Sequence, residues 1–277
     1  MKYKLLFALL CLFAVHLHAE HDGKIQILLL GDSTTEAKIP KLLVPNEPQL
    51  EDVIRILLAA EGDLPPTNVI NLGLSGEYIR RLIDTGRYDK EVAKLPGIDY
   101  ILIRYGLNDV VHVPEFDTAF PKSFHELLAR LRQDHPGAVL IPMTVIPMGE
   151  DLQADGVKAK RINDLVQQVA AEEKLKVFDI YPRYATEQAK GPNMLNYRRY
   201  PLAKIPEKYQ EMVKPYVSPG KDPTVVVLDN RLDAHFGNLP GWYGDRHPNL
   251  AGYHVIADET AKYLAPLLRE RAHAAAK

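Results

Sequence analysis

Two kinds of hydrophobic pattern alternate along this chain. Short, nearly continuous aliphatic runs are typical of strands that are buried on both faces of a parallel sheet. They lie at residues 24–30, 68–72, 99–105, 138–146 and 176–180. Between the runs, apolar residues recur every three or four positions, which predicts amphipathic helices. These segments lie at residues 51–58, 120–134, 156–174 and 250–271. Since strands that alternate with helices form right-handed crossovers, the pattern predicts an α/β fold with a central parallel sheet of about five strands, covered by helices on both faces.

The alternation breaks between residues 183 and 240, in a segment rich in Tyr, Pro, Arg and Lys. Within it, only residues 225–228 have strand character. Segments of this length inside a compact fold are most often functional insertions. We therefore predict a single domain over residues 20–277, with an insertion at about 183–240 that covers the edge of the active site.

The first nineteen residues have the pattern of a secretory signal peptide. Lys2 and Lys4 precede an apolar stretch at residues 5–15, and Ala19 is a small residue at the expected cleavage point. The stretch is too short for a typical transmembrane helix, although a membrane anchor and a buried strand are alternatives. The single cysteine, Cys11, lies in this stretch, so the mature protein would have no disulfide, thiol nucleophile or cysteine-ligated zinc. We predict a secreted or periplasmic protein with no stable membrane insertion after the signal is removed.

Composition places the protein among ordinary globular chains. Of its 277 residues, 46% are hydrophobic and 25% are charged, as expected for one large domain or two small ones. The formal net charge of −2 at pH 7 indicates no basic surface of the kind that binds nucleic acid. We therefore predict no nucleic-acid partner.

Four polar blocks carry the candidate chemistry, and the first three adjoin the carboxyl ends of aliphatic runs, where open α/β sheets place their active sites. The blocks are residues 31–33 (Gly-Asp-Ser), 71–73 (Asn-Leu-Gly), 106–109 (Gly-Leu-Asn-Asp) and 245–249 (Asp-Arg-His-Pro-Asn). Acyl transfer from an ester needs a hydroxyl nucleophile, a base, and donors to the oxyanion of the tetrahedral intermediate. Ser33 supplies the hydroxyl and His247 supplies the base. The Ser33 N–H, the Gly73 N–H and the Asn108 side chain would form the oxyanion hole, because they come from neighbouring strand ends.

In these four blocks the chain resembles the SGNH hydrolase (GDSL-type) family, whose blocks contribute Ser, Gly, Asn and His in the same order. The resemblance extends over about residues 25–265, apart from the insertion. It implies a three-layer α/β/α flavodoxin-like fold. It also implies serine esterase, acetylesterase, lipase or thioesterase activity, with no metal and no organic cofactor.

One departure from the family pattern concerns the residue that orients the base. The family has Asp three residues before His, but that position is Gly244 here, and Asp245 stands two residues before His247. We predict that Asp245 orients the imidazole in a tightened loop. A backbone carbonyl or Asp233 is the alternative orienting group, and His235, in a similar Asp-x-His arrangement, is the alternative base.

Two further carboxylates are predicted to support the site without touching substrate. Asp32 would bond backbone amides of the nucleophile turn. Asp109 would lie behind Ser33 and Asn108 in a similar supporting position.

These features predict a secreted serine hydrolase that cleaves carboxylic esters through an acyl-enzyme, most simply at O-acetyl groups on carbohydrate. Its partner would be a small-molecule or carbohydrate ester substrate. The insertion and the residues just beyond it supply aromatic and cationic side chains suited to stacking on sugar faces or binding acidic groups. They are Tyr184, Tyr197, Arg198, Arg199, Tyr200 and Trp242. Two alternatives stay open: a lipolytic or lysophospholipase-type esterase, and a non-catalytic carbohydrate-binding protein on the same fold.

Overall fold

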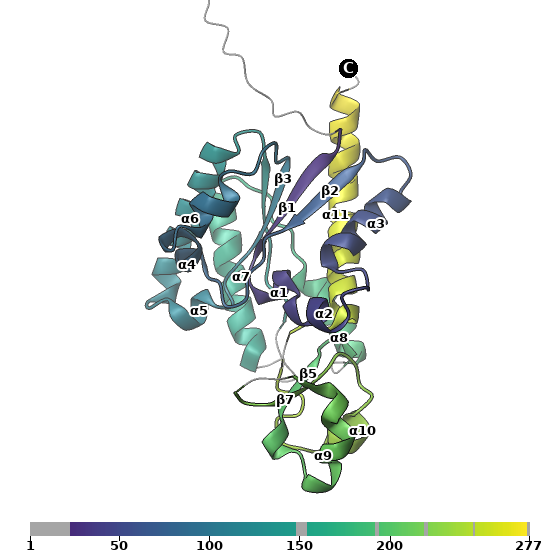
Figure 1. Ribbon diagram of the computed structural model, residues 1–277. Coiled ribbons are helices and arrows are strands. Elements are labelled where there is room, and N and C mark those ends of the chain that lie inside the picture. Colours follow the sequence, from purple (N-terminus) through teal and green to yellow (C-terminus); the bar gives the residue numbers. More distant parts are fainter. Residues whose placement is uncertain (1–22, 148–153, 192–193, 219–220, 246, 276–277) are drawn as a thin grey trace, which may run out of the picture.

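The computed structural model describes residues 23–147, 154–191, 194–218, 221–245 and 247–275. Among these residues, four parallel strands form the central sheet, in the order β2-β1-β3-β4 (Figure 1). They are β1 (Ile25–Gly31), β2 (Thr67–Asn71), β3 (Tyr100–Arg104) and β4 (Val139–Pro142). The predicted α/β fold with a parallel sheet is therefore confirmed. The predicted signal peptide, residues 1–19, lies outside the described residues.

The predicted fifth strand, at residues 176–180, joins the sheet only through an isolated parallel bridge between Phe178 and Met143. Here the Thr144 N–H donates to Phe178 O at 3.1 Å. The pairing ends there because the Thr144 hydroxyl accepts from the Tyr181 N–H at 3.2 Å, where helix α8 (Tyr181–Lys190) begins. The expected count of about five strands is therefore corrected to four strands and one bridge.

Helices cover both faces of the sheet, and the two-residue period of the strands divides the core between the faces. Ile27 and Leu29 of β1 belong to the core under α3 (Leu50–Ala60) and α11 (Leu250–Ala275). Leu28 and Leu30 belong to the core on the other face. That face is covered by α4 (Ile79–Asp84), α6 (Phe116–Asp134) and α7 (Ala154–Glu172). Figure 1 shows the sheet between these two layers, which is the expected three-layer arrangement.

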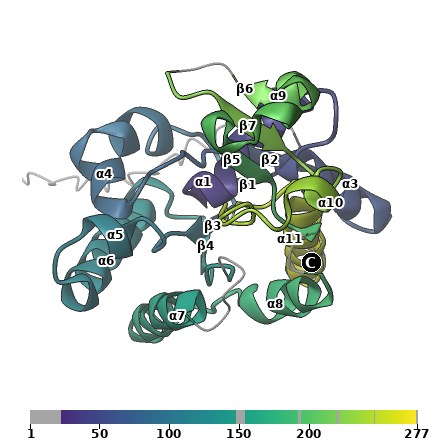
Figure 2. The same ribbon diagram turned by 90° about the horizontal axis from the view of Figure 1, so that it is seen from below.

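Short helical elements lie in the segments that connect the strands with the longer helices. They are α1 (Ser33–Glu36), α2 (Lys38–Leu43), α5 (Asp109–His112) and a π-helical turn (Tyr88–Val92). Seen from the end of the sheet where α1 emerges, α4, α5 and α6 lie on one side of α1, and α3 and α11 lie on the other (Figure 2). None of the helices in the described part of the chain is long and apolar enough to cross a membrane.

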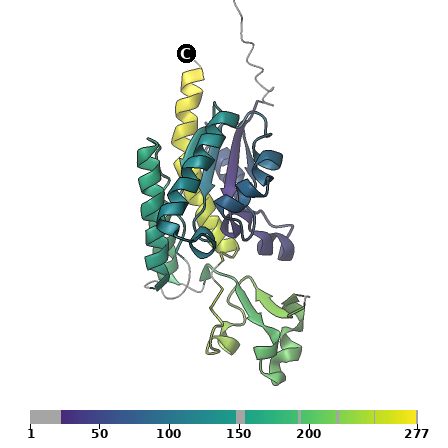
Figure 3. The ribbon, with the colours of Figure 1, turned by 90° about the vertical axis from the view of Figure 1, so that its left-hand side faces the viewer.

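Residues 198–242 form a small unit, called the insertion module below. Its antiparallel sheet has the order β5-β7-β6, with β5 (Arg198–Pro201), β6 (Val217–Ser218) and β7 (Thr224–Val227). Its helices are α9 (Glu207–Val213), α10 (Asp233–Phe236) and two 3-10 turns (Leu202–Lys204 and Lys214–Tyr216). The module lies beyond the end of the main sheet from which α1 emerges (Figures 1 and 3). Helix α8, most of which falls inside the predicted insertion, packs instead against α11 as part of the main body.

Candidate active site

The turn that joins β1 to α1 contains the predicted nucleophile, Ser33, and is called the nucleophile turn below. Gly31 ends the strand where an added Cβ would lie 2.4 Å from Thr35 Oγ1, so only glycine fits without displacing its neighbour. Asp32 then caps α1, since its Oδ1 accepts from the Thr34 N–H at 2.9 Å and from the Thr34 hydroxyl at 2.8 Å. Ser33 is the first residue of the helix and is half-buried. The turn therefore holds Ser33 at the carboxyl edge of the sheet.

Ser33, His247 and Asp245 form a continuous line of polar contacts. His247 Nε2 lies 2.9 Å from Ser33 Oγ, although 214 positions separate the two residues. On the other side of the ring, His247 Nδ1 lies 2.8 Å from Asp245 Oδ1. The same oxygen accepts from the His247 backbone N–H at 3.0 Å, which closes a turn of the kind that Asp favours. The shortened spacing is accommodated because the Asp245 carboxylate, two residues upstream, reaches both the backbone nitrogen and the ring nitrogen Nδ1 of His247.

The charge of Asp245 follows from its surroundings. Burial of this carboxyl acts to raise its pKa, but the hydrogen bonds and charge of His247, together with the charge of Arg199, lower the pKa of Asp245 below its usual value. Arg199 Nε lies 2.7 Å from Asp245 Oδ2. Asp245 is therefore ionised at neutral pH. An ionised acceptor favours the imidazole tautomer with its proton on Nδ1, which leaves Nε2 able to accept from Ser33.

The two alternatives considered from the sequence lie within the insertion module. Asp233 accepts from the Arg198 guanidinium at 2.9 Å and 2.7 Å, and from the Trp242 indole N–H at 2.8 Å. His235 packs beside Tyr209, with ring centroids 6.0 Å apart. The hydrogen bonds of Asp233 are thus made within the module, and neither Asp233 nor His235 joins the line of contacts between Ser33, His247 and Asp245.

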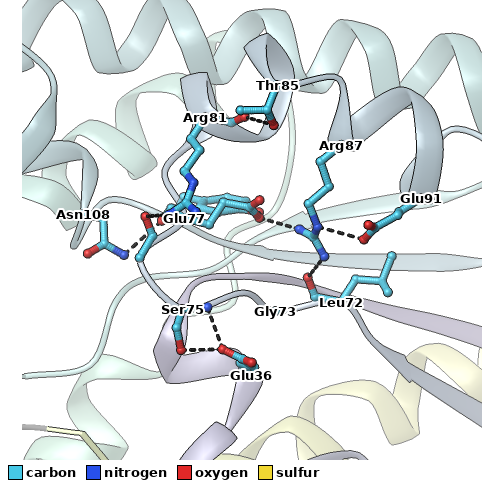
Figure 4. Close-up of polar contacts among 12 residues, drawn as sticks. Glu36, Leu72, Gly73, Ser75, Glu77, Arg81, Thr85, Arg87, Glu91 and Asn108 are labelled. Atoms are coloured by element: carbon cyan, nitrogen blue, oxygen red, sulfur yellow. Dashed lines mark hydrogen bonds and ion pairs between the residues drawn. The ribbon is translucent and has the colours of Figure 1, made fainter. Parts of the chain in front are cut away.

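A loop at residues 72–78 packs on the nucleophile turn (Figure 4). Its Leu74 N–H donates to Gly31 O at 3.0 Å. The Ser75 N–H donates to Glu36 Oε2 at 2.6 Å, and the Ser75 hydroxyl also donates to this carboxylate. Since Glu36 is the last residue of α1, the loop is fixed to the same short helix that carries Ser33.

Asn108 reaches this loop from the end of β3. Its Nδ2 donates to Glu77 O at 3.0 Å, which uses one of the two amide N–H bonds and leaves the other for a ligand. The Glu77 carboxylate is buried and accepts from Arg87 and Tyr105, each at 2.7 Å. Burial raises the pKa of Glu77 even though both donors act against that shift. The loop is therefore anchored inward by its side chain while its backbone holds the Asn108 amide (Figure 4).

The structure gives Gly73 a different place from the one predicted. Its N–H donates to Asn71 Oδ1 at 3.0 Å, so it is engaged within the loop and not directed at an oxyanion. An added Cβ would lie 2.4 Å from Glu36 N, so glycine is needed here for close packing against α1. Three residues later, Gly76 has a φ of +72°, and among the described residues its N–H has no hydrogen-bond partner. Gly76 is thus a candidate donor that the sequence reasoning missed, and the signal available was the Ser-Gly turn pair at 75–76.

A sequence model of the GDSL-like lipase/acylhydrolase family matches residues 29–199, more than half of the chain. This protein belongs to that family. The resemblance carried by the four sequence blocks is thereby confirmed, and this GDSL-like hydrolase is an ester-hydrolysing enzyme.

Solved structures of low sequence identity share the fold of this GDSL-like hydrolase. A lipase/acylhydrolase from Enterococcus faecalis superposes with a TM-score of 0.57 and 18% identity, covering 88% of this chain and 97% of that one. The acetyl xylan esterase AlAXEase gives a TM-score of 0.55 and 18% identity, covering 87% and 100%. Axe2, an acetylxylan esterase from Geobacillus stearothermophilus, gives 0.53 and 17%, covering 87% and 94%. No curated protein matches the sequence.

Two buried carboxylates support the loops of the GDSL-like hydrolase. Asp109 Oδ1 accepts from the Ile79 N–H at 3.0 Å, and its Oδ2 accepts from the Gly106 N–H at 3.0 Å. Burial raises the pKa of Asp109 to about 7 and also raises the pKa of Asp32. Both side chains therefore hold backbone N–H groups next to Ser33 and Asn108. In the part of the chain that the structure describes, no three His, Cys, Asp or Glu side chains are grouped closely enough to bind a metal ion.

The aromatic side chains predicted to stack on sugars are buried. Those that are at most 5% exposed are Tyr184, Tyr197, Tyr200 and Trp242. Trp242 packs against Phe236 in the core of the insertion module, with ring centroids 5.0 Å apart. Arg198 is buried as well, and in this set only Arg199 is exposed. The prediction of a stacking surface from these aromatic residues is wrong, because Tyr184, Tyr200 and Trp242 belong to the protein's cores and Tyr197 is buried beside His247.

Proposed function

We propose that this GDSL-like hydrolase cleaves carboxylic esters through an acyl-enzyme on Ser33, with His247 as base and Asp245 as the group that orients it. One observation supports this best. Ser33 Oγ lies 2.9 Å from His247 Nε2, and His247 Nδ1 lies 2.8 Å from Asp245. At these distances a proton can move from the hydroxyl to the imidazole without rearrangement of the side chains.

In the first half-reaction, Ser33 Oγ attacks the ester carbonyl carbon while its proton moves to His247 Nε2. The Asp245 carboxylate stabilises the resulting imidazolium. His247 then gives the proton to the alcohol oxygen as the C–O bond breaks, which leaves the acyl-enzyme. In the second half-reaction, a water molecule gives a proton to Nε2 and attacks the acyl carbon. Return of that proton to Ser33 Oγ releases the carboxylic acid and restores the enzyme.

Each tetrahedral intermediate carries a negative oxygen, which is stabilised by donors that are already in place. The Ser33 N–H lies at the start of α1, and no described residue accepts a hydrogen bond from it. Asn108 contributes the amide N–H that it does not use toward the loop. We assign the third donor to Gly76 in place of Gly73, because the Gly73 N–H is bonded to Asn71.

The substrate that we propose is an O-acetyl group on a carbohydrate outside the cytoplasm. Two proteins of similar fold are acetylxylan esterases by name. The first nineteen residues have the pattern of a secretory signal, and secretion would bring the enzyme to polymers of this kind.

A lipolytic esterase is the second candidate, and one surface feature favours it. A groove of about 540 Å³ lies between α2 and the insertion module, and its lining includes Leu42, Leu43, Val44, Pro215, Tyr216 and Val217. Leu42 is 64% exposed and Leu43 is 46% exposed. Since α2 follows the nucleophile helix directly, an acyl chain in this groove would favour esters of longer acids.

The test of the mechanism compares wild type with Ser33→Ala on p-nitrophenyl acetate. We expect kcat/KM to fall by about 10⁴-fold or more, the scale on which such nucleophiles contribute. Ser123→Ala is the matched control, because the Ser123 hydroxyl bonds the Ala119 carbonyl within α6 at 3.0 Å, and its activity should be unchanged. Turnover by Ser33→Ala equal to wild type would exclude Ser33 as the nucleophile.

A second set of substrates tests the specificity. Faster hydrolysis of acetyl than of octanoyl esters, with release of acetate from acetylated xylan, would support the carbohydrate acetylesterase. Preference for the octanoyl ester would support the lipolytic enzyme. A wild-type protein that turns over neither ester would contradict both candidates.

A further inference from the structure

The two oxygens of Asp245 have different partners. Oδ1 accepts from the His247 N–H at 3.0 Å and lies 2.8 Å from His247 Nδ1. Oδ2 lies 2.7 Å from Arg199 Nε. Asp245 is buried, whereas 48% of the Arg199 side chain is exposed. The only cation paired with this carboxylate in the described part of the chain, apart from His247 when protonated, therefore comes from the insertion module.

An anchor on Oδ2 changes what the carboxylate can do. Both contacts to His247 fall on Oδ1, so they oppose rotation about the Cβ–Cγ bond, a torsion whose preferences are broad, through that oxygen alone. The Arg199 contact on Oδ2 opposes the same rotation through the second oxygen. With a partner on each oxygen, the Asp245 carboxylate is held more firmly in the position from which it orients the imidazole.

Arg199 is delivered to this position by a segment that is bonded to the histidine loop. The Tyr197 N–H donates to His247 O at 3.2 Å, and the Asn249 N–H donates to Leu195 O at 2.8 Å. The Tyr197 ring lies nearly parallel to the imidazole, at 11° and with centroids 5.7 Å apart. The backbone between these contacts and β5 is therefore held in register with the base, and Arg199 follows two residues later.

Comparison with the neighbouring Arg198 shows that the placement of Arg199 beside Asp245 depends on the face of β5 from which the side chain extends. Successive side chains of a strand point to opposite faces, and Arg198 turns into the insertion module, where it pairs with Asp233. Arg199, on the other face of β5, pairs with Asp245. A pair between two exposed side chains contributes little, but here one partner is buried and belongs to the proposed catalytic machinery.

We infer that Arg199 is a positioning residue for the Asp245–His247 pair, through which the insertion module completes an active site whose Asp-x-His spacing is one residue short. The inference rests on the proposed serine esterase mechanism. It gives the module a role in the chemical step, in addition to any role in covering the site.

The test uses the full-length protein and three substitutions, with p-nitrophenyl acetate as substrate. Arg199→Gln should lower kcat by roughly ten- to hundredfold, as expected for a misplaced catalytic group, with KM changed by about twofold or less. Arg199→Lys keeps the charge and should recover part of the loss. Lys214→Gln is the control in the same module, since the exposed Lys214 pairs with Glu211 at 2.6 Å, and it should behave as wild type.

The pH dependence of kcat/KM separates positioning from a structural role. The groups that face the Asp245 carboxyl are His247, Arg199 and the Tyr197 phenol. The acid limb reports protonation of the coupled Asp245–His247 pair, and the positive charge of Arg199, which helps to lower the pKa of Asp245, opposes that protonation. Loss of the charge should therefore move the acid limb to higher pH in Arg199→Gln and not in Arg199→Lys. An unchanged kcat, or a loss of activity with an unmoved acid limb and lowered thermal stability, would overturn the inference.

A measurement without turnover keeps this result distinct from the fate of the mechanism itself. The Nδ1 proton of His247 should give a downfield proton resonance in wild type, and in Arg199→Gln this proton should exchange faster with water. Equal exchange in the two proteins would overturn the positioning role, even if Ser33→Ala shows that Ser33 is the nucleophile. If Ser33→Ala stays active, the proposed mechanism fails, whatever the exchange experiment shows.

Discussion

Replacement of Gly73 by Ala tests whether this glycine is needed for packing or as a donor. The added Cβ would lie 2.4 Å from Glu36 N and 2.7 Å from Thr35 C, both backbone atoms of α1. Ordinary contact begins near 3.4 Å, so the loop and α1 must separate by about 1 Å. Since Ser33 lies on α1, we expect kcat/KM to fall by about 10²-fold, the cost of a misplacement of this size. The free energy of unfolding should fall by about 1–3 kcal/mol, as in other overpacked sites.

The assay pairs kcat/KM on p-nitrophenyl acetate with urea unfolding. Gly137→Ala is the control, because an added Cβ there meets no atom within 4 Å, and both quantities should stay close to wild type. Alanine keeps its backbone N–H, so a pure donor role for Gly73 predicts nearly full activity. Activity within twofold of wild type together with unchanged stability would refute the packing explanation.

Two further substitutions test the base and the surface charge. Asp245→Asn presents an N–H in place of one carboxylate oxygen and removes the charge that stabilises the imidazolium. We expect kcat to fall by about 10⁴-fold in a protein that unfolds like wild type. A loss below about tenfold would show that Asp245 does not orient His247. His125 contacts Glu173 and Glu172, and its hydrogen bond to Glu173 raises its pKa above the usual value. Its contribution to stability should be complete below about pH 6.5 and be lost as the pH rises through the raised pKa. Urea unfolding of wild type and His125→Gln over this range should show a difference that shrinks with rising pH, and a constant difference would contradict the interpretation.

Ser33 and Asn108 could be placed from the sequence because each follows a strand that is buried on both faces. Such strands read as continuous aliphatic runs, and parallel strands bring their carboxyl ends to one edge of the sheet. The order β2-β1-β3-β4 makes the two strand ends neighbours, which the alternation of strands and helices alone could not establish. The sequence also could not predict that the pairing at Phe178 stops after a single bridge. Side-chain hydrogen bonds of Thr144 end that pairing, and a hydrophobic pattern does not show such bonds.

The glycines of the loop at residues 72–78 show a limit of a different kind. Gly73 and Gly76 both lie near the nucleophile turn, but one packs against α1 and the other adopts a left-handed backbone. Which N–H is already bonded depends on the side chain of Asn71, a contact that no spacing rule predicts. A glycine in a motif therefore predicts close approach of the backbone without saying to which atoms.

The aromatic residues near the insertion were misread because their composition fits two uses. The core of the insertion module combines aliphatic residues with the large rings of Tyr200, Phe236 and Trp242, which fill apolar volume there. Trp242 also donates to Asp233, which satisfies its buried N–H. Aromatic residues in a small unit without disulfides therefore favour a structural role over an exposed binding surface.

The short Asp-x-His spacing and the insertion module bear on each other. The sequence alone shows the spacing as a departure from the family pattern, and it predicts that the insertion covers the edge of the active site. In the structure, the carboxylate two residues before His247 closes a turn in which Oδ1 serves both nitrogens. That arrangement leaves Oδ2 to a partner from elsewhere in the chain, and the partner found there is Arg199, at the start of the module. The short spacing and the insertion module therefore act on the same carboxylate, that of Asp245. For this reason the role of the module is best measured through His247, by the exchange of its Nδ1 proton.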